Sequence, residues 1–352
     1  MRCSPGWLEP LVDRLRSFPN KVLQPLVPTL ERVEAGITQR QMRAGFGWDL
    51  RFAWYSPPPY LSQIRSTDSE PYPSPSLVGC AIAVNREHFF HMGGFDPNLE
   101  IWGGEHFELA FRTWMCGGLV ETIPCSTVGH LYRPLPYSFE GPALVILAKN
   151  LLRVANVWMD EYKHIVERSI RGLLGFLPVF SQQEMVTIEE RRSLRRQLNC
   201  KNFTWYLEHI FPEAEVPANN SVYFGEFLNV NTSHCLTVEN NTLVPTKRKC
   251  GSFVIVPENH FTVDSHGRFR HKGRCIVPNK NTMNLIMNEE HCFNTEHFWY
   301  GVNTTGPIVY SDAEGKLCLT HDLDLEQIRL NVCDVNDLEQ MWASLYYLKD
   351  DS

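Results

Sequence analysis

Residues 96–112 read DPNLEIWGGEHFELAFR, and this stretch decides how the first half of the chain is expected to fold. The apolar side chains after the two glycines recur at helical spacing, which predicts a helix from Glu105 to Met115. The glycine pair Gly117-Gly118 follows at the place where such a helix should end. The local pattern is therefore a glycine turn that opens directly into an amphipathic helix.

The turn before this helix, Trp102-Gly103-Gly104-Glu105, has chemistry that suits a sugar-binding pocket. A tryptophan ring can stack on a sugar, glycines let a ligand approach the backbone, and a carboxylate in the first helical turn suits the helix dipole. An ordinary N-terminal glutamate beside a core tryptophan is the alternative that the sequence leaves open. His130 follows a predicted strand and a glycine, and a lone histidine is more often structural than a ligand.

Strands and helices alternate along the first two thirds of the chain. The apolar run Leu77–Val84 predicts a strand buried on both faces, and Leu119–Ile123 predicts a second, short strand. Residues 150–175 are expected to be helical, and a charged helix at Glu189–Arg196 lies in an expected linker at residues 181–221. This alternation predicts an α/β layer.

From Val222 onward the segments are short, turn-rich and β-prone, and they contain an internal repeat. Each of three units begins with a cysteine, and a second cysteine follows 15 or 17 residues later. The expected pairs are Cys235–Cys250, Cys275–Cys292 and Cys318–Cys333. Units of about 40 residues with this cysteine pattern resemble a ricin-type (ricin B) β-trefoil lectin, in which the triplet Gln-x-Trp packs in the core at the end of a unit. Gln340-Met-Trp342 keeps that triplet, and His297-Phe-Trp299 is an imperfect copy.

The composition indicates a globular protein with secretory chemistry. A hydrophobic content of 43% can form a core, and a net charge of −7 with scattered Lys and Arg argues against a nucleic-acid partner. Eleven cysteines without a Cys-x-x-Cys pair, together with five Asn-x-Ser/Thr sequons, indicate disulfides rather than zinc. No apolar stretch has the length of a signal or a membrane anchor, so the chain is expected to be a fragment or a truncated product.

The longer motifs resemble one enzyme family. Residues 96–133 closely resemble the Gal/GalNAc-transferase motif of the polypeptide N-acetylgalactosaminyltransferases. Gly6–Leu11, Phe46–Tyr55, Asn150–Tyr162 and Leu198–Glu208 are similar to other segments of that family. The resemblance therefore covers nearly the whole chain.

This resemblance implies a GT-A type α/β catalytic domain, here partial, over residues 1–180, then the linker, then a β-trefoil lectin-like domain over residues 222–352. Family members transfer GalNAc with retention from UDP-GalNAc to Ser or Thr of acceptor proteins and glycopeptides, which is mucin-type O-glycosylation. They use Mn²⁺, and they are Golgi enzymes anchored as single-pass type II membrane proteins. Oxygen ligands together with imidazole suit Mn²⁺.

The resemblance also assigns roles to individual residues. The expected catalytic residues are Glu105 and Trp102, the expected donor-binding residues are Gly79, Trp102, Arg133 and Tyr137, and the expected metal ligand is His130. A disulfide between Cys116 and Cys200 is implied in the same way.

Some positions depart from the family pattern. The family's Asp-x-His lies just upstream of the segment with which this chain opens, Met1-Arg2-Cys3. We therefore expect the front half of the donor site and two metal ligands to be absent, which would leave His130 in an incomplete Mn²⁺ site. In the trefoil, Asp322 is a weak candidate for sugar binding, because it lies two residues later than the family's aspartate. The alternative function is a catalytically inactive module that binds glycoproteins or carbohydrates.

Overall fold

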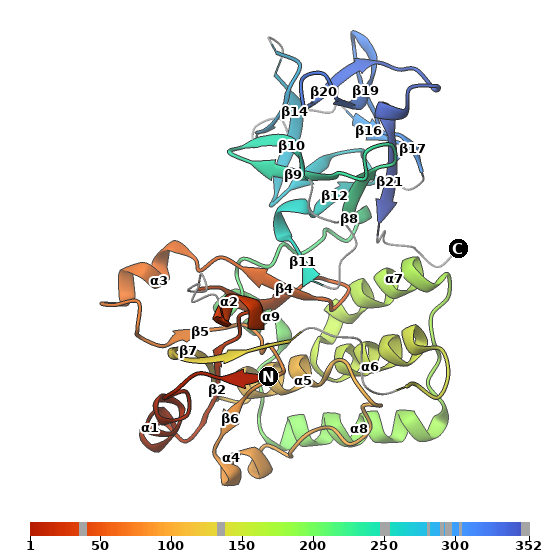
Figure 1. The fold of residues 1–352 in the computed structure, drawn as a ribbon. Coiled ribbons are helices and arrows are strands. Elements are labelled where there is room, and N and C mark those ends of the chain that lie inside the picture. The colour runs from red at the N-terminus through yellow and green to blue at the C-terminus, as the bar shows by residue number, and fades with distance from the viewer. Residues whose placement is uncertain are drawn as a thin grey trace. The chain divides into compact units, whose positions relative to one another are not determined.

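The structure is a computed structural model that describes residues 1–34, 41–131, 138–246, 254–279, 282–288, 292, 298–302 and 305–345. The chain divides into two compact units (Figure 1). Unit 1 comprises Met1–Val166 and Pro178–Ala214, and unit 2 comprises Glu167–Leu177 and Glu215–Ser352. Unit 1 mixes strands and helices, whereas unit 2 consists mainly of strands, so the expected order of an α/β region and an all-β region is confirmed.

A mixed sheet forms the centre of unit 1. Its strands are β1 (Arg2–Cys3), β2 (Lys21–Leu26), β5 (Tyr72–Pro73), β6 (Ala83–Val84) and β7 (Leu119–Gly129). β2 and β7 run parallel, while β1 and β5 pair antiparallel with β7 and β6 pairs antiparallel with β2. β7 is longer than the expected strand, because it continues past a register shift into its pairing with β1.

The strand expected at Leu77–Val84 is mostly a loop, and only its last two residues form β6. Gln24 of β2 provides the physical reason. Its side chain accepts a hydrogen bond from the backbone N–H of Val78 at 2.7 Å and donates to the carbonyl of Ser76 at 3.4 Å. A side chain thus satisfies backbone groups that a neighbouring strand would otherwise satisfy.

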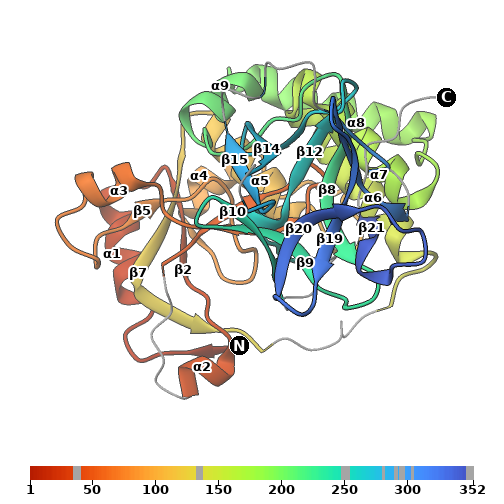
Figure 2. The ribbon, with the colours of Figure 1, turned by 90° about the horizontal axis from the view of Figure 1, so that it is seen from above.

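Helices cover both faces of the sheet. On one face, Leu11 of α1 (Glu9–Ser17) packs against Leu23 of β2 and Ile123 of β7. Alternate residues of a strand point to opposite faces, so the neighbouring residues of β2 and β7 point away from α1. Helix α5 (Glu105–Met115) lies on that other side of β2 and β7 (Figure 2).

The remaining elements of unit 1 are short, apart from two long helices. They are α2 (Leu30–Glu34), α3 (Pro59–Ile64), α4 (Arg86–His91), α6 (Ala143–Trp158), α8 (Gln182–Gln197), α9 (Phe203–His209) and the antiparallel pair β3 (Arg43–Phe46) and β4 (Phe52–Tyr55). Residues 181–221, expected as a linker, thus contain α8 and α9. In the described part of the chain, no helix combines the length and apolar character needed to cross a bilayer.

The helical stretch expected at residues 150–175 is interrupted. α6 ends at Trp158, and a 3-10 turn at Asp160–Tyr162 precedes α7 (Lys163–Leu174). Asp160 has a φ of 49°, and its carboxylate accepts the backbone N–H of Phe203 at 2.8 Å. This long-range contact, which local periodicity does not encode, accounts for the break.

Helix α5 has the bounds that the sequence predicted and is buried along almost its whole length. The rings of Phe107 and Phe111 lie 6.1 and 5.3 Å from that of Phe46 in β3, and Phe203 of α9 lies 5.2 Å from Phe111. A disulfide between Cys116 and Cys200 joins the end of α5 to the turn before α9. Aromatic packing and one covalent bond therefore fix this helix in the core.

Unit 2 is built from short strands around one core. They are β8 (Ser221–Asn229), β9 (Cys235–Glu239), β10 (Thr242–Thr246), β11 (Val254–Ile255), β12 (Phe261–Asp264), β13 (Phe269–His271), β14 (Arg274–Pro278), β15 (Leu285–Asn288), β16 (Phe298–Tyr300), β17 (Gly306–Pro307), β18 (Val309–Asp312), β19 (Gly315–Asp322), β20 (Gln327–Val332) and β21 (Met341–Leu345). Strands β12-β13-β14-β15-β10-β9-β8-β21-β17 are hydrogen-bonded in that order, and β12 also pairs with β8, which closes a ring. Strands β16-β18-β19-β20 form a second sheet.

Two tryptophans show that the repeat is structural. Trp299 and Trp342 are buried, and each indole N–H donates to a carbonyl 23 residues earlier in the chain. The acceptors are Ile276 at 3.2 Å and Leu319 at 2.8 Å, each directly after the first cysteine of its unit. The imperfect triplet that ends at Trp299 therefore packs as the intact one does, in the core.

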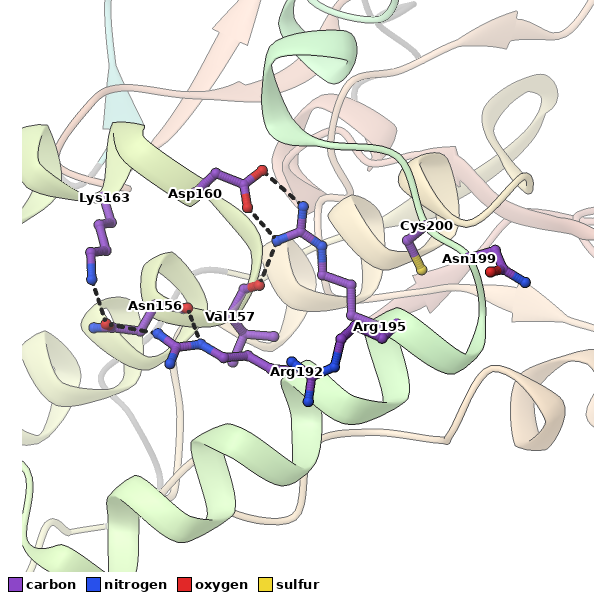
Figure 3. Close-up of a pocket in the computed structure, with 9 residues that line it drawn as sticks. Asn156, Val157, Asp160, Lys163, Arg192, Arg195, Asn199 and Cys200 are labelled. Carbon is purple, nitrogen blue, oxygen red and sulfur yellow. Dashed lines mark hydrogen bonds and ion pairs between the residues drawn. The ribbon is translucent and has the colours of Figure 1, made fainter.

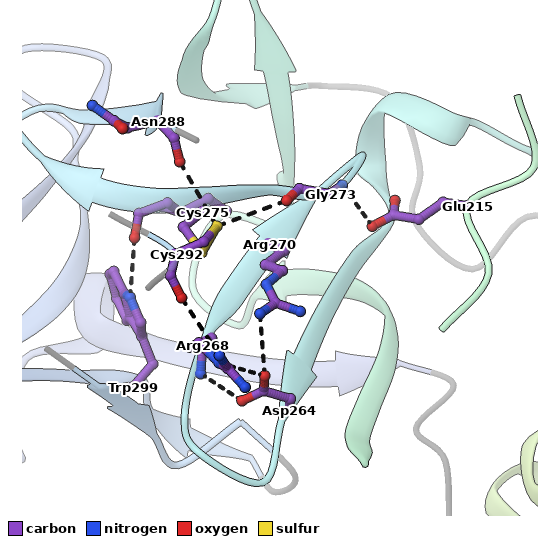
Figure 4. Close-up of a disulfide and its surroundings, with 10 residues drawn as sticks. Glu215, Asp264, Arg268, Arg270, Gly273, Cys275, Asn288, Cys292 and Trp299 are labelled. Carbon is purple, nitrogen blue, oxygen red and sulfur yellow. Dashed lines mark hydrogen bonds and ion pairs between the residues drawn. A yellow bond between two sulfur atoms is a disulfide. The ribbon is translucent and has the colours of Figure 1, made fainter. Parts of the chain in front are cut away.

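Disulfides close the described units of the repeat. Bonds join Cys275 to Cys292 and Cys318 to Cys333, and Figure 4 shows the first of them together with Trp299. Cys235 is also disulfide-bonded, and Cys250, its expected partner, lies outside the described residues.

Removing the Cys318–Cys333 bond should destabilise unit 2. The bond spans 15 residues, and closing a loop of that size stabilises the folded state by about 3 kcal/mol in the chain-entropy model. We expect Cys318→Ala/Cys333→Ala to lower the free energy of unfolding by about that amount, measured by urea denaturation followed through near-ultraviolet circular dichroism. Cys3→Ala, at an exposed free thiol, is the matched control and should leave the value unchanged. An unaltered urea midpoint in the double variant would contradict the assignment.

Candidate functional site

The turn at residues 100–104 is held in place by Asn150 of α6. The side chain of Asn150 accepts the backbone N–H of Glu100 at 2.9 Å, and it donates to the carbonyls of Glu100 at 2.8 Å and Trp102 at 3.1 Å. Ile101 lies between these contacts with a φ of 58°, a left-handed conformation that is costly for a β-branched residue. A single buried amide thus fixes a strained turn.

The two glycines of the turn are required by packing. Gly103 and Gly104 have φ values of 102° and 94°. A Cβ at Gly103 would lie 2.2 Å from Leu147 of α6, and one at Gly104 would lie 3.3 Å from Val154. The expected reason for these glycines was close approach of a ligand to the backbone. That reason stays a prediction, and the structure adds a second one, which is close approach of the turn to α6.

Trp102 and Glu105 are partly exposed at the start of α5. One carboxylate oxygen of Glu105 accepts the backbone N–H of Gly103 at 2.7 Å, and a carboxylate in the first turn is favoured by the helix dipole. A flat aromatic ring and a carboxylate on a rigid backbone can together bind a sugar, the ring by stacking and the carboxylate by accepting hydroxyl hydrogen bonds.

A network of buried ion pairs holds the helices next to this turn in place. Arg153 of α6 pairs with Asp96 at 2.8 Å, and Glu108 of α5 pairs with Arg112 at 2.8 Å and with Arg191 of α8 at 2.7 Å. Burial alone would raise the pKa of Glu108, but the two arginines outweigh burial and lower that pKa. Glu108 is therefore charged, and the network locks α5 to α8 and the residues before α5 to α6.

Gly79 lies against the first turn of α5. A Cβ at Gly79, whose φ is 84°, would lie 3.0 Å from the Cβ of His106. Burial lowers the pKa of His106 to about 4, and burial raises the pKa of the neighbouring Cys80 thiol to about 11. The structure thus brings the expected donor residue Gly79 next to the turn that carries Trp102 and Glu105.

The direction of α5 determines at which edge of the sheet the turn at residues 100–104 lies. Trp114, at the end of α5, donates its indole N–H to the carbonyl of Ser74 at 2.9 Å, and the N–H of Ser74 donates to Val120 of β7 at 3.1 Å. His106, at the start of α5, instead meets the loop at Gly79. Helix α5 therefore runs antiparallel to β7, and its first turn points toward the carboxyl end of that strand.

His130 follows β7 at the same edge of the sheet. Its N–H donates to the carbonyl of Pro28 at 2.8 Å, and its carbonyl accepts the N–H of Leu30 at 2.9 Å. Burial lowers the pKa of His130, which favours the neutral imidazole that metals bind. The carboxyl edge of parallel strands is where open α/β sheets bind their ligands.

Part of the expected site lies beyond what the structure describes. Arg133 and Tyr137 fall outside the described residues, so their donor-binding role stays a prediction. Within the described ranges, no three His, Cys, Asp or Glu side chains are grouped so that they could hold a metal ion. The Mn²⁺ site expected at His130 therefore also stays a prediction.

Asp322 in unit 2 already has protein partners. Its carboxylate accepts the N–H of Leu325 at 3.0 Å and pairs with Arg329 at 3.4 Å. His321 is buried, and its Nδ1 lies 3.0 Å from the hydroxyl of Thr232. His321 and Asp322 are adjacent residues of β19, and adjacent strand residues point to opposite faces of a sheet.

Sequence reasoning missed the two polar residues that position the candidate site, Asn150 and Gln24. Neither belongs to a motif that carries chemistry. The sequence signal that could have identified them is an amide side chain within a mainly apolar segment. Such an amide is expected to be buried, and a buried amide needs hydrogen-bond partners, so it indicates a residue that holds nearby backbone in place.

The sequence of this chain is similar to those of known glycosyltransferases. Residues 61–134 match the family model described as the N-terminal domain of galactosyltransferase. Human polypeptide N-acetylgalactosaminyltransferase 6 is 40% identical over 247 residues, which cover 68% of this chain and 39% of that protein. Mouse polypeptide N-acetylgalactosaminyltransferase 5 is 28% identical over 370 residues, which cover 97% of this chain and 37% of that protein. The chain thus spans about two fifths of the length of these relatives.

A solved structure is similar over nearly the whole chain. The crystal structure of GalNAc-T7 with UDP, GalNAc and Mn²⁺ superposes with a TM-score of 0.54 at 26% identity, covering 97% of this chain and 63% of that one. The match spans both the α/β region and the all-β region, so the fold is that of a partial GT-A type domain followed by a lectin-like β-trefoil.

Replacing Asn150 should destabilise the turn at residues 100–104. Asn150→Ala removes three part-buried hydrogen bonds, so the N–H of Glu100 and the carbonyl of Trp102 lose this partner. We expect the free energy of unfolding to fall by about 2–4 kcal/mol, measured by urea denaturation. Asn98→Ala, at an exposed position two residues before the turn, is the matched control and should have little effect. Equal values for the two variants would show that Asn150 does not hold the turn.

The three described free cysteines should react at different rates. Cys3 and Cys125 are exposed, whereas burial raises the pKa of Cys80 to about 11. At pH 8 roughly one Cys80 thiol in a thousand is a thiolate, which is the reactive form. We expect iodoacetamide to modify Cys80 far more slowly than the other two in native protein, measured by peptide mass mapping. In urea the three rates should converge, and rapid modification of native Cys80 would contradict the raised pKa of its thiol.

Proposed function

Because this chain belongs to the polypeptide N-acetylgalactosaminyltransferase family, we propose that it contributes to the transfer of GalNAc from UDP-GalNAc to Ser or Thr hydroxyls of proteins, in mucin-type O-glycosylation. In that reaction the bond from sugar C1 to the diphosphate breaks, and the electron pair leaves with UDP. The acceptor oxygen bonds to C1 on the same face, and its proton passes to the departing diphosphate. Disulfide bonds in both units suit the Golgi, which is the compartment we propose.

The observation that carries the proposal is the rigid turn at residues 100–105. It presents a partly exposed ring, Trp102, and a carboxylate, Glu105, beside Gly79. We assign Trp102 to stacking on the sugar and Glu105 to hydrogen bonding with the reacting sugar or acceptor. His130 lies toward the same edge of the sheet, where a nucleotide diphosphate would bind.

The residues described do not fit a complete Mn²⁺ site. GalNAc-T7 was crystallised with Mn²⁺, and a divalent cation would neutralise the charge that develops on a departing diphosphate. His130 offers one imidazole, and the described segments contain no group of three His, Cys, Asp or Glu side chains that could hold a metal ion. We therefore assign no step of the reaction to a metal held by these residues.

The second candidate function is a module that binds carbohydrate without catalysis. It is favoured by the lectin-like trefoil, whose core tryptophans are in place in two units. The partners of Asp322 leave its carboxylate partly exposed at the end of β19, where a sugar hydroxyl can reach it. This module would hold glycoproteins through unit 2.

Calorimetric titration of UDP into the full chain, with and without Mn²⁺, tests the first candidate. We expect micromolar binding of UDP that Mn²⁺ does not strengthen, and at least tenfold weaker binding by His130→Ala, which corresponds to about 1.4 kcal/mol. His91→Ala, at an exposed histidine, is the matched control and should bind like the unmodified chain. Absence of UDP binding under both conditions would overturn the donor-site proposal.

Binding of a GalNAc-bearing peptide to the full chain tests the second candidate. Binding that Asp322→Asn removes would then establish the second candidate.

A further inference from the structure

A basic pocket lies between the carboxyl-terminal ends of α6 and α8. It has a volume of about 710 Å³, and all of its lining residues belong to unit 1 (Figure 3). Four of them are cations, Lys163, Arg192, Arg195 and Arg196, whereas Asp160 is the one carboxylate that lines it. None of the lining residues belongs to the turn at residues 100–105, so the pocket is distinct from the candidate donor site.

Two of the four cations are neutralised by the protein itself. Arg195 makes a two-pronged ion pair with Asp160 at 2.7 and 2.8 Å, and it also donates to the carbonyl of Val157. Arg196 pairs with Glu189 at 2.7 Å. These contacts explain why arginines end α8, because they satisfy a carboxylate and the last carbonyls of α6.

Lys163 and Arg192 are not neutralised in the same way. Lys163 Nζ and Arg192 Nη2 approach the same neutral acceptor, Asn156 Oδ1, at 3.3 and 3.4 Å. Both distances are long for hydrogen bonds. Arg192 meets the carboxylate of Glu189 only at 3.5 Å, and Lys163 has no ion pair in the described part of the chain. Two positive charges that share one amide oxygen repel each other.

The Arg192 side chain is nevertheless held in a defined position. Arg192 Nε donates to the backbone carbonyl of Asn156 at 2.9 Å, and Arg192 Nη2 lies 3.4 Å from Asn156 Oδ1, so Asn156 fixes the guanidinium at the pocket wall (Figure 3). A fixed guanidinium fork beside an ammonium group matches the oxygens of a tetrahedral anion, which can accept from both at once. Such an anion would replace two long contacts by charge-assisted hydrogen bonds.

We propose that this pocket binds a tetrahedral oxyanion, a phosphate or sulfate group, between Lys163 and Arg192. The anion is either a free ion or an ester on a larger ligand, because the pocket has room for a sugar-sized group behind it. Asn156 positions the two cations, and Arg195 and Asp160 form the neutral wall beside them.

Calorimetric titration of the full chain tests the proposal, with ionic strength held constant by sodium chloride. Sodium sulfate, sodium phosphate and a sulfated disaccharide are titrated separately. We expect saturable binding that Lys163→Gln weakens at least tenfold and that Lys163→Gln/Arg192→Gln abolishes. Arg16→Gln removes an exposed arginine outside the pocket, is the matched control, and should bind as the unmodified chain does.

The comparison of probes distinguishes the two sources of the anion. Equal affinity for sulfate and the disaccharide identifies a free-ion site, whereas at least tenfold tighter binding of the disaccharide identifies an ester-bearing ligand. The Lys163 side chain contacts Asn156 only at 3.3 Å, and the backbone N–H of Lys163 that caps the turn at Asp160–Tyr162 is kept in Lys163→Gln, so this variant should keep the unfolding midpoint of the unmodified chain in chloride. No saturable binding of any probe, or binding that the double variant retains, would overturn the proposal.

Discussion

The buried ion pairs of Glu108 and Asp96 are the constraint on which unit 1 depends. Arg112, Arg153 and Arg191 surround these carboxylates, and each of the five side chains is at most 9% exposed. Removing a buried charge from its partners is costly, so these groups specify one arrangement of the helices that carry them. The network therefore selects the relative positions of α5, α6 and α8 more strongly than apolar packing alone would.

The candidate site inherits its rigidity from this arrangement. The network fixes α6, and α6 presents Asn150, Leu147 and Val154 to the turn before α5. The strained backbone at Ile101 persists because the amide of Asn150 holds the residues on both sides of it. Strain held by a buried polar contact is a common property of functional turns. The chemistry proposed for Trp102 and Glu105 thus rests on residues that never touch a substrate.

Local patterns in the sequence predicted those parts of the fold that local forces determine. The helix at Glu105–Met115 follows from the spacing of its apolar residues, and the trefoil units follow from their cysteines. The strand expected at Leu77–Val84 was wrong, because Gln24, which is distant in the sequence, satisfies the backbone there. The break at Asp160 was missed for the same reason. Of the candidate site, the motif residues were predictable, whereas the amide and ion pairs that position them depend on tertiary contacts.

The Cys116–Cys200 disulfide also has a topological consequence. It closes a covalent loop between two cysteines that are 84 positions apart in the sequence. This loop includes Glu167–Leu177, a segment that belongs to unit 2 although the residues on both sides of it belong to unit 1. The chain therefore passes between the units at three places, and two of these crossings lie inside the loop. A protease that cuts once within the loop would produce two fragments that stay joined until the disulfide is reduced. A cut between Ala214 and Glu215 lies outside the loop and separates residues 215–352 from the rest of the chain, whereas Glu167–Leu177 stays attached to unit 1. The place of the cut, and not only the number of cuts, therefore decides which fragments a protease releases.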